Sequence, residues 1–154
     1  MSSRISSSLD ILVMVRQVDT PIPWVDKRRQ KHEQDKMPLI VIAEDEFLIA
    51  EVLAVMLEEA GYEVATALHG MQALALVREK RPSLVITDFR MPVMTGLELA
   101  QAMRADEELS HIPVILVSGA QASIGRAHPD LFDAVLDKPY DEKKLIEVAS
   151  RLIT

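Results

Sequence analysis

The residues of this chain best suited to chemistry are three acids, one hydroxyl and one amine that each follow a short apolar run. They are Glu44, Asp45, Asp88, Ser118 and Lys138. Carboxylates that lie close together repel one another and need a counter-charge. A hard divalent cation such as Mg²⁺ supplies that charge, binds carboxylates, and leaves coordination positions for phosphate oxygens. The ammonium group of Lys138 is suited to the same anion.

This combination permits the transfer of a phosphoryl group to a carboxylate. An aspartate oxygen attacks phosphorus in line, while nearby positive charge neutralises the equatorial oxygens. An aspartyl phosphate is a known type of covalent intermediate. Each residue also has a simpler interpretation, because Glu44 and Asp45 suit a helix start and Asp88 suits a turn. The joint pattern favours the chemical interpretation, since all of them follow strands expected to end at one edge of a sheet.

Predicted strands and helices alternate along the chain and position these residues. Short continuous apolar runs are typical of strands buried on both faces of a sheet. The predicted strands are Leu39–Ala43, Glu63–Ala67, 84–87, 114–117 and 134–136. The predicted longer helices are 47–60, Gly70–Lys80, 96–105 and 141–152. Alternation over about 115 residues predicts an α/β fold, a doubly wound five-stranded parallel sheet with helices on both faces.

Three helical segments carry features that bear on the site. The first helix has one apolar side, made of Leu48, Val52, Val55 and Met56. Thr95 and Glu98 have the spacing of a capping box, which predicts where the third helix begins. The segment 120–133 contains Gly125 and Pro129, which limit any helix there to a turn or two. In open parallel sheets, ligands bind beyond the carboxyl ends of the strands.

Four motifs, in their order and spacing, resemble the receiver domains of bacterial response regulators in two-component systems and phosphorelays. They are Ile42-Ala43-Glu44-Asp45-Glu46, Asp88-Phe89-Arg90-Met91-Pro92 with Gly96, Val117-Ser118-Gly119 and Asp137-Lys138-Pro139. The resemblance covers roughly residues 38–153. It implies a flavodoxin-like fold with strand order 2-1-3-4-5 and a signalling domain rather than an enzyme.

The resemblance also implies an acceptor and a metal site. Asp88 would accept the phosphoryl group from a histidine kinase or a histidine phosphotransfer protein. Glu44 and Asp45 would bind Mg²⁺ together with Asp88 and the backbone carbonyl of Arg90. The protein would then signal through contact with a downstream protein that the sequence does not name.

Three further residues receive roles from the same resemblance. Ser118 would hydrogen-bond the phosphoryl group and trigger the conformational switch. Lys138 would bind the phosphate, and Pro139 after it would be cis. Receivers usually carry an aromatic residue three positions before this lysine, where this chain has Val135. The chain departs from the family at this position, and Phe132 and Tyr140, which lie at other positions, are the candidate substitutes.

Composition and charge limit the partners. Residues 38–154 contain 10 Lys and Arg against 19 Asp and Glu, a net charge of −9, which argues against direct binding of nucleic acid. Residues 1–37 carry a net charge of +2 and show no sustained periodicity, so we expect an irregular N-terminal extension before a receiver domain at 38–154. The chain has no cysteine, and no apolar run approaches the roughly 20 residues that span a bilayer. We therefore expect a cytoplasmic protein without membrane contact.

Two alternatives to the phosphorylated receiver stay open. Only one helix is predicted after Lys138, so we expect a stand-alone receiver with no attached output domain. The same fold could serve as an interaction module that is independent of phosphorylation. It could also be a small aspartate-based phosphatase, although such enzymes carry an Asp two residues after the nucleophile, where this chain has Arg90.

Overall fold

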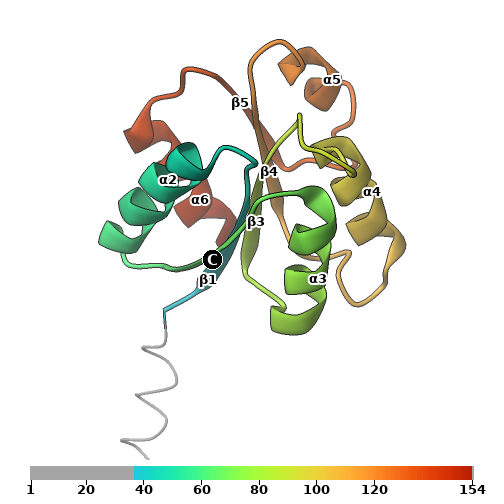
Figure 1. Cartoon of the computed structure of the whole chain (residues 1–154), viewed down its shortest axis with the longest axis horizontal. Helices are drawn as coiled ribbons and strands as arrows, with labels where there is room; N and C mark the ends of the chain where they lie inside the picture. The colour runs from blue at the N-terminus through green and yellow to red at the C-terminus, as the bar shows by residue number, and fades with distance from the viewer. Residues whose placement is uncertain (1–36, 154) are drawn as a thin grey trace, which may run out of the picture. The chain divides into compact units, whose positions relative to one another are not determined.

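A parallel sheet forms the centre of residues 37–153, the part of the chain that the computed structural model describes (Figure 1). Its strands are β1 Leu39–Ala43, β2 Glu63–Ala67, β3 Leu84–Asp88, β4 Val114–Ser118 and β5 Ala134–Asp137. The helices are α2 Phe47–Glu59, α3 Gly70–Lys80, α4 Gly96–Ala105, α5 Ala122–Arg126 and α6 Glu142–Ile153. The strands lie in the order β2-β1-β3-β4-β5, so the predicted doubly wound fold and its strand order are confirmed. The irregular extension expected at residues 1–37 lies, apart from Met37, outside the described residues and stays a prediction.

The central strands are buried because helices cover both faces of the sheet. In β1, β3 and β4, nearly every side chain is buried, as a continuous apolar run predicts. Alternate side chains of these strands divide between two cores. One core packs against α2 and α6, and the other packs against α3 and α4 (Figure 1). In the part of the chain described here, no helix is both long and apolar enough to cross a membrane.

Helix α2 buries a different side from the one that the sequence suggested. Of the predicted apolar side, Leu48, Val52 and Val55 are exposed and only Met56 is buried. The helix instead buries Ala50, Leu53, Ala54, Met56 and Leu57. Because α2 is apolar around most of its circumference, periodicity alone could not decide which side faces the sheet. The outcome is an exposed apolar surface on a helix that starts directly after the acidic residues.

Helix α4 begins where the capping box predicts. The Thr95 hydroxyl accepts a hydrogen bond from the Glu98 backbone N–H at 3.1 Å, and the Glu98 carboxylate accepts one from the Thr95 N–H at 2.9 Å. The next residue, Gly96, donates its N–H to the Phe89 carbonyl at 2.9 Å. The start of α4 is thereby fixed against the residues that follow β3.

Helix α5 has five residues, as the glycine and proline of its segment predicted. Gly125 lies over Leu116 and Val135, where a Cβ on the glycine would come within 3.2 Å of the Val135 Cγ2. The absence of a side chain at Gly125 lets α5 approach the sheet closely. Val135, at the position where receivers usually carry a ring, is therefore packed directly beneath the helix.

Candidate functional site

The predicted site residues gather at one edge of the sheet because parallel strands all end there. Glu44 follows β1, Asp88 is the last residue of β3, Ser118 is the last of β4, and Lys138 follows β5. In the strand register, Asp88 pairs with Val117 and Ser118 pairs with Asp137. The backbone N–H of Lys138 donates to the Ser118 carbonyl at 2.9 Å, which ties the two loops together.

Three carboxylates form a cluster at this edge. Glu44, Asp45 and Asp88 each offer one oxygen, and these oxygens lie within 4.8 Å of one another. Glu44 is buried with 4% of its surface exposed, Asp88 is half-buried and Asp45 is exposed. Burial raises the pKa of Glu44, and the negative charge of Asp88 raises it further. The hydrogen bond from the Glu46 N–H and the attraction of Lys138 lower this pKa, but they do not outweigh the burial. Burial and the neighbouring acid therefore disfavour the charged form of Glu44.

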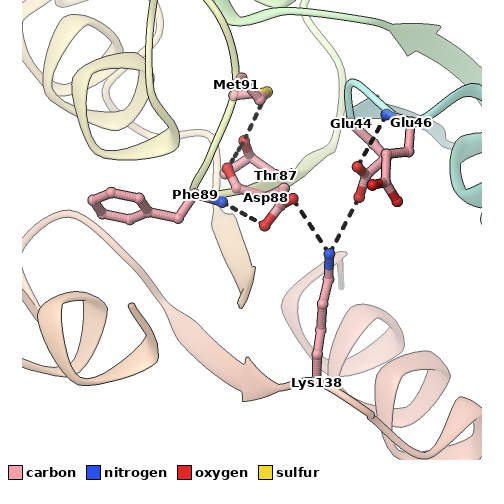
Figure 2. Close-up of polar contacts among 7 residues, drawn as sticks. All are labelled: Glu44, Glu46, Thr87, Asp88, Phe89, Met91 and Lys138. Atoms are coloured by element: carbon pink, nitrogen blue, oxygen red, sulfur yellow. Dashed lines mark hydrogen bonds and ion pairs between the residues drawn. The ribbon is translucent and has the colours of Figure 1, made fainter. Parts of the chain in front are cut away.

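Lys138 supplies positive charge between the two inner carboxylates. Its Nζ lies 3.3 Å from Asp88 Oδ2 and 3.4 Å from Glu44 Oε1, as Figure 2 shows. Desolvation lowers the pKa of Lys138, but the combined attraction of Asp88 and Glu44 outweighs it, and the pKa lies above its ordinary value. The ammonium group therefore stays charged at neutral pH, and faces the two acids.

Backbone groups fix the orientation of these acids. The Phe89 N–H donates to Asp88 Oδ1 at 2.7 Å, and the Glu46 N–H donates to Glu44 Oε2 at 3.2 Å (Figure 2). Beneath Asp88, the buried Thr87 hydroxyl donates to the Asp88 carbonyl at 2.8 Å. The Asp88 carboxylate is thus held with one oxygen on the backbone and the other facing Lys138.

The structure also places residues for which the sequence left roles open. Tyr140 lines the pocket that contains Glu44, Asp88 and Lys138, and burial raises the pKa of its hydroxyl. Phe132 instead lies in the core on the α3 and α4 side of the sheet. Of the two proposed substitutes for the missing ring, only Tyr140 lines this pocket. The Lys138–Pro139 peptide bond is cis, as predicted.

The donor set at this edge fits a hard divalent cation. Three carboxylates within reach of one another, one of them buried with a raised pKa, match the oxygen ligands that Mg²⁺ takes in proteins. Arg90, whose backbone carbonyl was suggested as a further ligand, lies in the loop directly after β3. The exposed Asp45 and half-buried Asp88 leave the cluster open to a phosphate oxygen from solvent.

Comparison with known proteins identifies the class of protein. Residues 40–150 match the family described as the response regulator receiver domain, and the chain belongs to this family. The predicted membership in two-component signalling is confirmed.

Among curated proteins, the chain is similar to the polar-differentiation response regulator DivK of Brucella anthropi and of Brucella ovis. Each is 34% identical over 110 residues, a match that covers 70% of this chain and 89% of the relative. Among solved structures, the chemotaxis response regulator CheY4 of Vibrio cholerae is 28% identical with a TM-score of 0.69. That match covers 76% of this chain and 99% of that one.

A third similarity bears on the metal. The receiver domain of a sensor histidine kinase from Pseudomonas aeruginosa is 25% identical with a TM-score of 0.70, covering 77% of this chain and 98% of that one. That structure has a magnesium ion coordinated in its active site cleft. Receiver domains as a family bind Mg²⁺ at an acidic pocket, and this chain has an acidic cluster at the carboxyl edge of its sheet.

Proposed function

We propose that this chain is a phospho-accepting receiver and that Asp88 takes the phosphoryl group from a histidine kinase or a histidine phosphotransfer protein. The observation that carries the proposal is the position of the Lys138 Nζ, 3.3 Å from Asp88 and 3.4 Å from Glu44. An ammonium group held between two acids at the carboxyl edge of the sheet is placed to neutralise the oxygens of a transferring phosphoryl group.

The transfer needs a carboxylate nucleophile and a leaving group on phosphorus. An oxygen of Asp88 forms a bond to phosphorus while the bond from phosphorus to the donor's imidazole nitrogen breaks. The imidazole leaves with the electron pair of that bond. Its nitrogen then takes up a proton from solvent. The hydrogen bond from the Phe89 N–H orients Asp88 for this attack.

Glu44, Asp45 and Asp88 would hold Mg²⁺, together with the backbone carbonyl of Arg90. When bound, the ion neutralises charge on the carboxylates and on the phosphoryl oxygens. Ser118 would read the new charge through a hydrogen bond from its hydroxyl. Because β4 pairs with β3 on one side and β5 on the other, a shift at Ser118 reaches both neighbouring loops.

The exposed apolar surface of α2 supports a protein as the phosphoryl donor. Phe47 is 59% exposed and Leu48 is 76% exposed, and both lie in the first turn after the acidic residues. Apolar side chains gathered beside a reactive site are typical of a protein interaction surface. A donor protein bound there would bring its phosphohistidine to the open side of the cluster. The proposal includes a cytoplasmic location. It also includes a downstream protein that the phosphorylated receiver contacts.

Two other functions fit the fold less well. A phosphorylation-independent interaction module would not need Lys138 held between Glu44 and Asp88. An aspartate-based phosphatase would need an acid two residues after Asp88, and that position holds Arg90. We therefore regard the chain as a phosphoacceptor that promotes only its own phosphorylation and dephosphorylation.

Incubation with acetyl phosphate and Mg²⁺, followed by intact-mass measurement, tests the proposal. We expect one phosphoryl adduct on the wild-type chain and none on Asp88→Asn. Asp130→Asn, at an exposed aspartate in the segment between α5 and β5, should behave as the wild type in the adduct assay. Equal labelling of the wild type and Asp88→Asn would contradict the proposal, as would steady turnover of a phosphate ester without an adduct.

A further inference from the structure

The side chain of Arg90 contacts a residue on the neighbouring loop. When the amide oxygen of Gln121 faces the guanidinium, it accepts hydrogen bonds from Arg90 Nε and Nη2, each at 3.0 Å. In the opposite orientation, the amide oxygen would face only acceptors and the amide nitrogen only donors. The hydrogen-bonding pattern therefore fixes the first orientation.

This contact joins the two loops that would carry the phosphoryl group and its signal. Arg90 lies two residues after Asp88, and Gln121 lies three residues after Ser118. Gln121 is also the residue that immediately precedes α5. Since β3 and β4 are neighbours in the sheet, the contact bridges adjacent loops at the edge where the site lies.

A second arginine holds the other end of α5. Arg126, the last residue of this helix, forms a two-pronged ion pair with Asp137 at the end of β5, with one hydrogen bond at 3.2 Å. The helix is thus held by an arginine contact at each end, one to the loop after β3 and one to the end of β5. Both contacts are solvent-accessible, so each is weak enough to exchange for a better partner.

Beneath α5, at the position where receivers usually carry a ring, a valine packs against a glycine of the helix. Val135 fills that position, and Gly125 lies directly over it and over Leu116. At position 135, therefore, no ring is present to carry a signal by its rotation. The contact between Arg90 and Gln121 connects the loop after Asp88 to the start of α5.

We propose that Arg90 is a phosphoryl-binding residue that, in the unphosphorylated protein, is held by Gln121. The inference rests on the proposed phosphorylation of Asp88. A phosphoryl group carries a charge of about −1.5 to −2 and offers oxygens that match a guanidinium in two-pronged geometry. It is a stronger acceptor than the neutral amide of Gln121. Arg90 therefore exchanges Gln121 for the phosphoryl group, and the first turn of α5 is released.

Beryllofluoride with Mg²⁺, a stable mimic of a phosphoryl group on aspartate, allows a direct test on the full chain. Bound beryllofluoride is detected by ¹⁹F NMR, and the mobility of α5 is followed by amide hydrogen exchange. We expect exchange at residues 122–126 to become on the order of five-fold faster when beryllofluoride binds the wild type, as expected for loss of an exposed charge-assisted contact. Gln121→Ala should show that faster exchange before beryllofluoride is added.

The arginine itself has a separate readout. Arg90→Ala should exchange rapidly at α5 with or without beryllofluoride, and should bind it roughly ten-fold more weakly because a charged ligand of the phosphoryl mimic is lost. Gln101→Ala on α4 and Arg78→Ala on α3 are exposed controls that should behave as the wild type.

Each outcome of this experiment decides the inference. Bound beryllofluoride with unchanged hydrogen exchange in α5 of the wild type would overturn the inference. Slow α5 exchange in free Gln121→Ala, or wild-type affinity in Arg90→Ala, would do the same. If the wild type bound no beryllofluoride, the proposed phosphorylation of Asp88 would be contradicted. The inference about Arg90 would then fail as well.

Discussion

Gly96 lies against the backbone carbonyl of Asp88, so closely that a Cβ on Gly96 would overlap the carbonyl oxygen. The start of α4 is therefore packed onto the residue that we propose as the acceptor. A hydrogen bond of 2.9 Å from the Gly96 N–H to the Phe89 carbonyl holds the start of α4 in this position. The orientation of Asp88 depends in this way on a residue eight positions later in the chain.

Gly96→Ala should displace the Asp88 backbone and weaken both folding and labelling. Overpacking of this kind lowers the free energy of unfolding by about 1–3 kcal/mol. Urea unfolding measures that loss, and intact mass after acetyl phosphate treatment measures the slower labelling. Gly119→Ala is the matched control for stability, because a Cβ there meets nothing within 4 Å. If Gly96→Ala matched the wild type in stability and labelling, the close contact between Gly96 and the Asp88 carbonyl would not constrain the position of Asp88.

Mg²⁺ should stabilise the fold, because the site proposed for it is a carboxylate cluster that exists only in the folded state. A ligand present at 100 times its dissociation constant raises the free energy of unfolding by about 2.7 kcal/mol. Thermal unfolding across a Mg²⁺ titration measures this effect. Asp45→Asn removes one exposed carboxylate of the proposed site and should shift the titration to higher concentrations, whereas Glu63→Gln on β2 should not. A wild-type melting temperature that is independent of Mg²⁺ would contradict the metal site.

The Arg126–Asp137 ion pair should give a recognisable dependence on pH. The hydrogen bond from Arg126 holds the pKa of Asp137 below its ordinary value of 3.8. A lowered carboxyl pKa contributes stability that is present above the unfolded value and is lost as pH falls through the folded value. NMR titration of the Asp137 carboxyl carbon should therefore show a midpoint below 3.8 that rises in Arg126→Gln. Both side chains are exposed, so added salt should reduce the difference. An unchanged midpoint in Arg126→Gln would rule out the pair as its cause.

Val93 should be a site at which substitution raises stability. Its φ angle of 71° is left-handed, which a β-branched residue adopts only with strain, and the side chain is 82% exposed. Asn tolerates this conformation better, and left-handed strain costs roughly 1–2 kcal/mol per residue. We expect Val93→Asn to raise the free energy of unfolding by about 1 kcal/mol in urea titrations. Val52→Asn, on the exposed side of α2, lacks the strain and should give no gain. A loss of stability in Val93→Asn would show that the valine makes a contact worth more than its strain.

Continuous apolar runs in β1 and β3 made the parallel sheet predictable. The charged residues directly after these runs made it predictable that the site lies at the carboxyl ends of the strands. The sequence indicated that Glu44, Asp88 and Lys138 would meet, and the structure confirms that they lie together. Their chemical roles remain predictions.

The buried side of α2 was not predictable, because apolar residues surround most of that helix. The contact between Arg90 and Gln121 was also hidden, since two polar residues in irregular loops have no periodicity that would pair them. The packing of Gly125 on Val135 depends on how closely a short helix approaches the sheet, which tertiary packing decides.

The most direct test of the central claim is to locate the phosphoryl group itself. Borohydride reduces an aspartyl phosphate to homoserine, so peptide mapping after treatment with acetyl phosphate, Mg²⁺ and borohydride reports the modified residue. Phosphorylation of Asp88 predicts homoserine at position 88, and its loss when Mg²⁺ is replaced by a chelator. Homoserine at another acidic residue, or none in a fully folded Mg²⁺-containing sample, would contradict the assignment of Asp88 as the acceptor.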